Sequence, residues 1–322
     1  MAKNYEKQGR NGEQRDTKGR KPPQIKCSGW LWTIKDGAMK IKCNCCDGIY
    51  NSFDVHFTSG CDNKCAHCID THFSGIGKVK PEVKAIVETI VTNSLRVDDV
   101  LFLGGEPCLY IDELLNCVRQ IKARTRLKVF VTTSVPQICH ARKDLFFELI
   151  SELDGINLSV QHYRESKADE IRRTLSMYDR QSFYKSLPDK HKIRINLNIV
   201  KPVLHTKDEI TACLRHYDVM GFGSIKLSEI QHGKDVYISF CDVFDLKMGS
   251  AYSHGCQSYL DMPRIIPGFR TPVVLKRSCF LCEESLKASV ADGAKMIAKI
   301  FRPTRNNYGV VYEDGSLMTG WI

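Results

Sequence analysis

Between residues 51 and 230 the chain alternates short apolar segments with longer amphipathic ones. The apolar segments are rich in Val, Ile, Leu and Phe, which is typical of short parallel strands buried on both faces. The amphipathic segments carry apolar residues three or four positions apart, as surface helices do. The expected strands are Phe53–Phe57, Val100–Gly105, Leu127–Thr133, Gly155–Gln161, Ile193–Val200 and Ser224–Ile230. The expected helices are Val83–Leu95, Ile111–Ala123, Lys143–Leu153, Asp169–Ser186 and Lys207–Met220.

Six strands with helices between them predict an α/β fold with a parallel sheet. Functional side chains of such folds lie at the C-terminal ends of the strands. The alternation stops outside this region, which predicts four parts of the chain. They are a basic tail (1–26), a Cys-rich segment (27–50) with a hairpin turn at Asp36-Gly37, the β/α core (51–230), and a smaller Cys-rich C-terminal domain (231–322) that closes with a hairpin turning at Asp314-Gly315.

The charge of the chain is uneven. Its 322 residues carry a net charge of +10, and the tail alone holds eight basic and three acidic side chains. So polar a tail is expected to be disordered, and it could contact nucleic acid or an acidic partner or be a solvated leader. No apolar run approaches the length of a membrane span, and the N-terminus lacks the apolar stretch of a secretory signal. We therefore expect a cytoplasmic protein without membrane contact, whose cysteines stay reduced.

The chain has 15 cysteines, and three of them follow the first strand in the segment FTSGCDNKCAHCID. Cys61, Cys65 and Cys68 form a CxxxCxxC motif there. Three thiolates can bind three irons of a four-iron cluster and leave the fourth iron open to another ligand. Zinc is the alternative, with His67 or His72 as fourth ligand, although structural zinc sites usually combine two paired knuckles.

A second motif, LFLGGEP, follows the second strand and contains Gly104, Gly105 and Glu106. CxxxCxxC after the first strand, combined with Gly-Gly-Glu after the second, resembles the radical S-adenosylmethionine (radical SAM) superfamily. In the Cys motif His67 stands where an aromatic residue is usual. The resemblance covers residues 51–229 and implies a partial TIM-type (β/α)6 barrel.

The resemblance implies two cofactors, a [4Fe-4S] cluster on Cys61, Cys65 and Cys68 and S-adenosylmethionine (SAM). In the family, SAM chelates the fourth iron, and one electron from a reductant such as flavodoxin or ferredoxin cleaves its sulfonium. The product is a 5′-deoxyadenosyl radical, which abstracts hydrogen from the substrate and must be shielded from water. The two glycines permit close approach, and the Glu106 carboxylate could hold the amino group of SAM.

Polar residues at the ends of later strands extend this expected site. The SAM-binding residues that the resemblance implies are His67, Gly104, Gly105, Glu106, Thr133, Ser159 and Asn198. Comparable positions, each of which could equally be an ordinary strand-end hydrogen-bonding residue, are Thr132, Ser134, Gln161 and Asn196. Residues that could face the substrate or form a solvated turn are Glu229, Gln231 and His232. No catalytic side chain is assigned; Cys108 could donate a hydrogen atom, but such a residue is more often a small buried apolar one.

The C-terminal cysteines resemble those of the auxiliary-cluster extensions called SPASM or twitch domains. Cys279 and Cys282 form a CxxC motif, and Cys256 precedes them. These three could bind a second iron–sulfur cluster completed by Cys241 or an N-terminal cysteine; zinc, or no metal, are the alternatives. The full SPASM pattern is absent. Cysteines that could join this centre or form another are Cys27, Cys43, Cys45 and Cys46.

These features favour a radical SAM enzyme that modifies a peptide or protein side chain, because Cys-rich extensions most often accompany that chemistry. Modification of a nucleotide or nucleic acid is the alternative, and the positive charge and basic tail favour it. A non-catalytic iron–sulfur or zinc interaction protein is a third hypothesis. The intact Cys motif and Glu106 argue against it.

Overall fold

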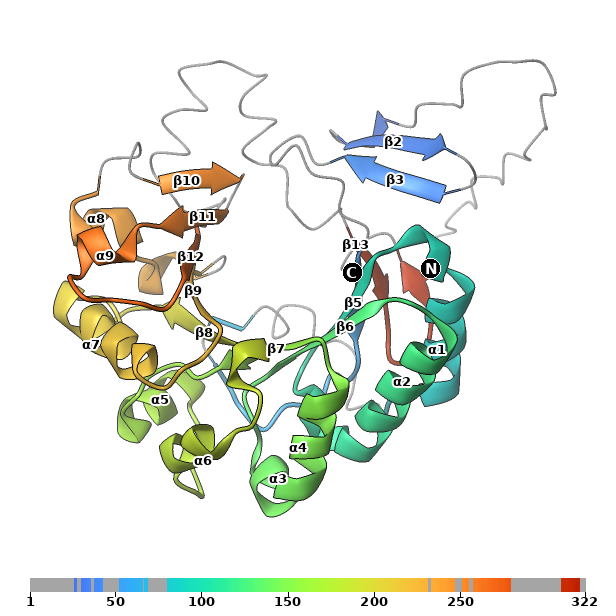
Figure 1. Cartoon of the computed structure of the whole chain (residues 1–322), viewed down its shortest axis with the longest axis horizontal. Helices are drawn as coiled ribbons and strands as arrows, with labels where there is room; N and C mark the ends of the chain where they lie inside the picture. The colour runs from blue at the N-terminus through green and yellow to red at the C-terminus, as the bar shows by residue number, and fades with distance from the viewer. Residues whose placement is uncertain are drawn as a thin grey trace, which may run out of the picture.

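A computed structural model describes residues 26–27, 30–35, 38–42, 52–65, 67–68, 80–230, 233–246, 251–254, 257–278 and 308–318. Most of the strands belong to one 11-stranded sheet, and a separate sheet has three strands. The large sheet curves into a horseshoe with helices along its outer side (Figure 1). It is open, with β10 (Ala251–His254) at one edge and β14 (Leu317–Met318) at the other. The fold is therefore α/β, with a partial barrel.

The six strands expected in the core are present and lie side by side in chain order, all parallel. They are β4 (Ser52–His56), β5 (Asp99–Leu103), β6 (Lys128–Thr133), β7 (Gly155–Ser159), β8 (Ile193–Ile199) and β9 (Ser224–Glu229). Their C-terminal ends consequently meet at one end of the barrel, where the Cys and Gly-Gly-Glu motifs begin.

Two further parallel strands extend this sheet, so eight consecutive strands are parallel. β12 (Val273–Lys276) pairs with β9, and β13 (Tyr308–Val311) pairs with β4. The antiparallel β11 (Gln257–Leu260) joins β12 to β10, and β14 forms a hairpin with β13 around Asp314-Gly315, as expected. In the described part of residues 231–322, the strands thus continue the barrel sheet rather than forming a sheet of their own.

The helices cover the outer face of the sheet (Figure 1). They are α1 (Val83–Thr92), α2 (Ile111–Arg124), α3 (Gln137–Ala141), α4 (Lys143–Glu152), α5 (Glu165–Arg172), α6 (Arg180–Ser186), α7 (Lys207–Asp218), α8 (Phe240–Phe244) and α9 (Met262–Ile265). Four 3-10 turns are η2 (Ser94–Arg96), η3 (Pro107–Tyr110), η4 (Lys190–Lys192) and η5 (Lys234–Val236). Within the described residues, every helix is too short or too polar to cross a membrane.

The single helix expected over Asp169–Ser186 is wrong, because two helices, α5 and α6, share this segment. The chain leaves α5 at Arg173, whose φ of 54° is left-handed. Asp179 then begins α6 by accepting a hydrogen bond from the backbone N–H of Ser182. Local side-chain hydrogen bonds of this kind compete with helix continuation, and apolar spacing alone does not reveal them.

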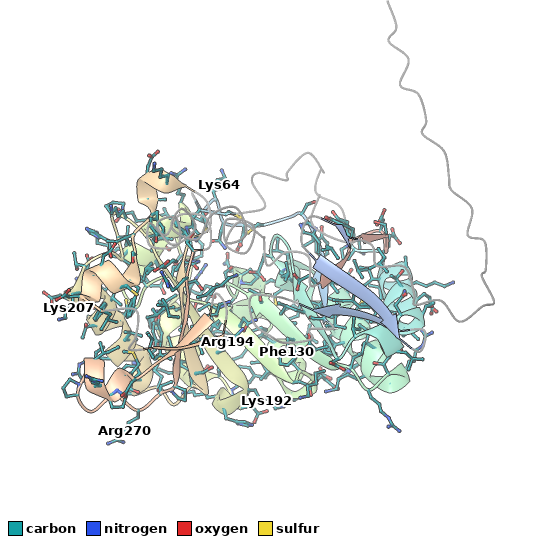
Figure 2. The ribbon with its side chains drawn as sticks, turned by 90° about the horizontal axis from the view of Figure 1, so that it is seen from above. Lys64, Phe130, Lys192, Arg194, Lys207 and Arg270 are labelled. Carbon is teal, nitrogen blue, oxygen red and sulfur yellow. The ribbon has the colours of Figure 1, made fainter. Side chains whose placement is uncertain are left out.

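Side-chain alternation along the strands separates an apolar outer face from a polar inner wall. In β8 the residues Ile193, Ile195, Leu197 and Ile199 are buried in the main core, whereas the residues between them are only half-buried. The alternating β8 therefore differs from the expected strand with two apolar faces. Arg194 on β8 and Phe130 on β6 lie in the middle of the molecule in Figure 2, whereas Lys64 lies at its margin.

The small sheet contains β1 (Lys26–Cys27), β2 (Trp30–Lys35) and β3 (Ala38–Lys42), all antiparallel. Lys35 pairs with Ala38, so β2 and β3 are adjacent antiparallel strands, whereas Asp36 and Gly37, the expected turn, lie outside the described residues. Cys27 lies in β1. Cys43, Cys45 and Cys46 lie outside the described residues.

Candidate active site

The Cys motif occupies the loop that follows β4. Its three cysteines are half-buried, and the backbone N–H of Asn63 donates to the Cys61 sulfur at 3.3 Å. The N–H of Cys68 donates to the carbonyl of Cys65 at 3.1 Å and closes a turn around the last two cysteines. In the part of the chain that the structure describes, no three His, Cys, Asp or Glu side chains converge closely enough to hold a metal ion. His72, the alternative zinc ligand, lies outside it.

The thiols of this loop are electrostatically suited to a cationic centre. Burial, followed by the nearby Glu106 carboxylate, raises the pKa of Cys61 to about 12. Burial and the neighbouring Cys68 raise the pKa of Cys65 to about 11. Without a cation the thiols therefore stay protonated, and thiolates need positive charge to compensate them. Soft thiolate donors on one loop fit an iron–sulfur cluster, whose irons would supply that charge.

The Gly-Gly-Glu motif packs directly on the backbone that leads into the Cys motif. The N–H of Gly105 donates to the Thr58 carbonyl, and the N–H of Glu106 donates to the Gly60 carbonyl, both at 2.7 Å. Gly104 has a left-handed φ of 114°, and a Cβ there would lie 2.8 Å from the Thr58 oxygen. A Cβ on Gly105 would collide with the carbonyl of Gly60. Both glycines are thus required for the contact between the two motifs.

Glu106 is 2% exposed, and both of its carboxylate oxygens are hydrogen-bonded. Oε1 accepts from the N–H of Cys108 at 3.1 Å and from the Thr133 hydroxyl at 2.6 Å. Oε2 accepts from the N–H and the hydroxyl of Ser134, both at 2.7 Å. Burial raises the pKa of Glu106, and these hydrogen bonds oppose that shift. Four donors fill the acceptor sites of a carboxylate, so Glu106 here joins the ends of β5 and β6.

Ser134 also connects this group to the Cys motif. Its hydroxyl oxygen accepts a hydrogen bond of 2.9 Å from the side-chain amide of Asn63, which lies between Cys61 and Cys65. The ends of β4, β5 and β6 therefore form one hydrogen-bonded unit around Glu106. The hydroxyl of Thr133, an expected SAM-binding residue, donates its hydrogen to Glu106 within this unit.

His67 and Asn198, two of the expected SAM-binding residues, are in contact. The His67 Nε2 lies 3.0 Å from the Asn198 Nδ2, which comes from β8. Burial lowers the pKa of His67 to about 4, so the ring is neutral at pH 7 and Nε2 can accept from the amide. The contact fixes the last turn of the Cys motif against the inner wall of the barrel.

Ser159 and Asn196 lie on neighbouring strands of the inner wall. Ser159, the last residue of β7, is half-buried and pairs in register with Asn196 of β8. The Asn196 side-chain oxygen is buried and accepts no hydrogen bond within the described structure. A buried polar atom of this kind fits a ligand with hydrogen-bond donors.

Cys108 is fully buried, and its thiol contacts that of Cys139. A hydrogen-atom donor must reach the substrate, and this side chain does not. Glu229 is also buried, and its carboxylate accepts from the N–H groups of Phe240 and Ser278 at 3.0 and 2.8 Å. Glu229 therefore does not lie in a solvated turn. Gln231 and His232 lie outside the described residues.

Arg172 is a site residue that the sequence did not reveal. It is 1% exposed, and its carbonyl accepts the N–H of Lys64, between Cys61 and Cys65, at 2.8 Å. Its guanidinium donates to the Val160 carbonyl at 3.0 Å, and its positive charge opposes the rise in the pKa of Cys65. A basic residue in an amphipathic segment is expected on the solvent side, so no sequence signal marks it.

Three cysteines were expected to hold an auxiliary cluster, and all three lie outside the described residues: Cys256, Cys279 and Cys282. Cys241 is described, and it is half-buried in α8.

The sequence matches the profile of the Radical SAM superfamily over residues 55–209. No curated protein matches the chain. Similar solved structures include SuiB from Streptococcus suis, at 20% identity and a TM-score of 0.46 over 59% of this chain and 42% of SuiB. The structure of anSMEcpe with bound AdoMet has 13% identity and a TM-score of 0.47, over 83% of this chain and 74% of that one. TsrM, a radical S-adenosylmethionine methyltransferase from Kitasatospora setae, has 16% identity and a TM-score of 0.46, over 59% of this chain and 36% of TsrM.

The chain spans less than half the length of SuiB and of TsrM. The profile match runs from the end of β4 to the start of α7 and contains the Cys motif and the Gly-Gly-Glu motif. It thus includes the whole hydrogen-bonded unit around Glu106. Residues 55–209 of this chain therefore match the radical SAM superfamily, whose enzymes use a [4Fe-4S] cluster and S-adenosylmethionine.

Proposed function

We propose that this protein reductively cleaves SAM and uses the resulting radical to modify a peptide or protein side chain. The observation that carries the proposal is the hydrogen-bonded unit that holds the Cys motif against Gly105 and Glu106. A bound cluster would supply the one electron that breaks the sulfonium C–S bond of SAM into methionine and a 5′-deoxyadenosyl radical. Cys61, Cys65 and Cys68 would hold the cluster.

The remaining residues would position the ligands and limit access of water. The unit around Glu106 holds the backbone of the loop that carries the thiols. The neutral His67, held by Asn198, closes one side of that loop without adding charge. Ser159 and the buried oxygen of Asn196 would meet the polar groups of SAM. Gly104, Gly105, Glu106 and Thr133 would act chiefly by shaping the strand ends around SAM.

A polypeptide substrate is supported by the open sheet. Among the described residues the 11 strands do not close, and β10 and β14 are the edges. Edge strands present unpaired backbone groups that can hydrogen-bond an extended peptide. A small nucleotide has no peptide backbone that could pair with these edge strands.

A second iron–sulfur cluster on Cys256, Cys279 and Cys282 is part of this proposal. Gln257, which follows Cys256, is the register partner of Lys276, which precedes Cys279 by three residues. Ser278 is fully buried and bound to Glu229 at the C-terminal end of β9, the end of the barrel that also carries the Cys motif. The chain therefore enters this Cys-rich segment beside the proposed active site.

The experiment is a substrate test with the anaerobically reconstituted protein. It is incubated with SAM, dithionite and either mixed tryptic peptides or mixed nucleotides and RNA, and 5′-deoxyadenosine is measured. Peptides should raise its formation severalfold above the substrate-free rate, and nucleotides should not. Stimulation by nucleotides or RNA alone would replace the peptide proposal with nucleic-acid modification.

A further inference from the structure

The loop between α5 and α6 presents two large apolar side chains to solvent. Leu175 is 79% exposed and Met177 is 73% exposed. Exposed apolar side chains cost free energy in water, and where they are grouped they often mark a site of protein contact. Arg173 in the same loop is exposed as well.

This exposure belongs to a fixed segment, because the alternate residues are anchored inward. The N–H of Ser176 donates to Asp169 at 2.9 Å, and its hydroxyl oxygen lies within hydrogen-bonding distance of Asp169 (2.6 Å) and Glu165 (2.8 Å). The Tyr178 hydroxyl donates to the Val135 carbonyl at 2.6 Å. Residues 174, 176 and 178 therefore hold the loop while residues 173, 175 and 177 point outward.

The segment also lies directly beside the Cys motif. The hydroxyl of Thr174 donates to the carbonyl of Asp62 at 3.1 Å, and the N–H of Lys64 donates to the carbonyl of Arg172 at 2.8 Å. Asp62 and Lys64 both lie between Cys61 and Cys65. Lys64 is exposed at the margin of the molecule (Figure 2). Lys64, Arg173, Leu175 and Met177 together are called the loop surface below.

The charge of the loop surface is positive. Lys64 and Arg173 take part in no ion pair among the residues that the structure describes. Of the nearby carboxylates, Glu165 and Asp169 point inward and lie 3.6 and 3.5 Å from the guanidinium of Arg172, Asp62 is half-buried, and Asp179 at the end of the segment is exposed. An apolar pair flanked by basic side chains fits a partner with an apolar contact and an acidic rim.

We propose that the loop surface docks an acidic one-electron carrier protein. The inference rests on the proposed function, which needs one electron at a centre held by Cys61, Cys65 and Cys68. The carrier's reduced flavin or iron–sulfur cluster loses one electron, the centre gains one, and no covalent bond forms or breaks. Because electron transfer weakens steeply with distance, a carrier must bind beside the ligand loop, where the loop surface lies.

The test measures binding of two acidic probes, an oxidised flavodoxin and a ferredoxin, to the full-length reconstituted protein by calorimetry at low salt. Leu175→Asp/Met177→Asp is compared with Leu95→Asp/Val219→Asp, which changes residues that are 94% and 84% exposed outside the loop surface. The loop variant should bind about tenfold more weakly, and the control should bind as the wild type does. Arg173→Glu should weaken binding and reduce its salt dependence.

A second readout separates docking from cluster assembly. Reduction of the centre is followed by stopped-flow absorbance with reduced flavodoxin and with dithionite. The loop variant should be slowed about tenfold with flavodoxin and unchanged with dithionite, which needs no docking surface.

Three results would overturn the docking inference while leaving the proposed function intact. They are equal binding by wild type and loop variant, binding of neither probe by the wild type, and a loop variant whose only change is loss of self-association or of peptide binding. Failure of the wild type to cleave SAM with dithionite would instead contradict the proposed function.

Discussion

At the scale of single residues, Glu106 determines how the two motifs meet. Its carboxylate accepts four hydrogen bonds from three neighbouring residues, while buried at 2% exposure. A buried carboxylate is costly unless donors satisfy it, and here every acceptor site is used. The Gly-Gly-Glu motif therefore has a structural role that does not depend on SAM.

Glu106→Gln should destabilise the protein although it preserves size. The NH₂ group of the new amide has two possible orientations. In one it would face the hydrogen-bond donors of Cys108 and Thr133, and in the other it would face those of Ser134. Leaving buried donors unsatisfied costs about 1–3 kcal/mol, which urea unfolding of the cluster-free protein would measure.

Glu113→Gln is the matched control for this substitution. Its carboxylate pairs with Lys80, whose side chain is 69% exposed, and such surface pairs contribute less than about 1 kcal/mol. Equal stabilities of the Glu106 and Glu113 variants would contradict the structural role of Glu106.

At the scale of elements, the C-terminal hairpin of β13 and β14 is tied to the start of the barrel. Glu313 follows β13, and its Oε2 lies 3.0 Å from the Nδ1 of His56 in β4. The N–H of Glu82 donates to the Glu313 carbonyl, and the Thr89 hydroxyl of α1 donates to the Gly315 carbonyl. Gly315 has a φ of 80°, and a Cβ there would lie 2.6 Å from Ala85. The hairpin thus closes the β4 side of the sheet.

Glu313→Gln should reduce stability at pH 7 and have a smaller effect at pH 3. Burial acts to raise the pKa of Glu313, but the hydrogen bond and charge of His56 lower it below its ordinary 4.5. A carboxyl with a lowered folded-state pKa stabilises the fold above its unfolded pKa, and this contribution disappears as the pH falls through the folded value.

Thermal unfolding at both pH values checks this prediction. The expected loss at neutral pH is about 1.5–3 kcal/mol, the contribution of a buried hydrogen bond to a charged group. Glu88→Gln, at an exposed pair with Arg124, is the control and should change little. A Glu313 effect that is the same at both pH values would show that the charge is not involved.

The elements also show how far the sequence predicts the fold. The six core strands follow from apolar runs because burial acts on each strand locally. The addition of β12 and β13 to the sheet does not follow from the sequence pattern, because it depends on residues far apart in the sequence. Tyr308, for example, pairs with Ser52. The break between α5 and α6 depends on Ser176 and Asp169, whose hydrogen bonds leave the apolar spacing unchanged.

At the scale of the whole molecule, functional groups that are far apart in the sequence lie together at one end of the barrel. The parallel strands place them there. Both motifs were predictable, because their residue types and spacing suit a cluster and a close backbone contact. Their junction was not, because Asn63, Ser134 and Arg172 are ordinary polar residues until the fold brings them together. The same junction fixes the loop surface beside the thiols.

The central claim is that Cys61, Cys65 and Cys68 hold a [4Fe-4S] cluster that binds SAM. The most direct measurement is electron paramagnetic resonance of the dithionite-reduced, anaerobically reconstituted protein, with and without SAM, together with its iron and sulfide content. The Cys61/Cys65/Cys68→Ala variant is the control. We predict a reduced-cluster signal whose shape changes on adding SAM in the wild type, and loss of about four irons and of that SAM response in the variant. A wild-type signal indifferent to SAM, or a variant that keeps the full iron content, would contradict the account.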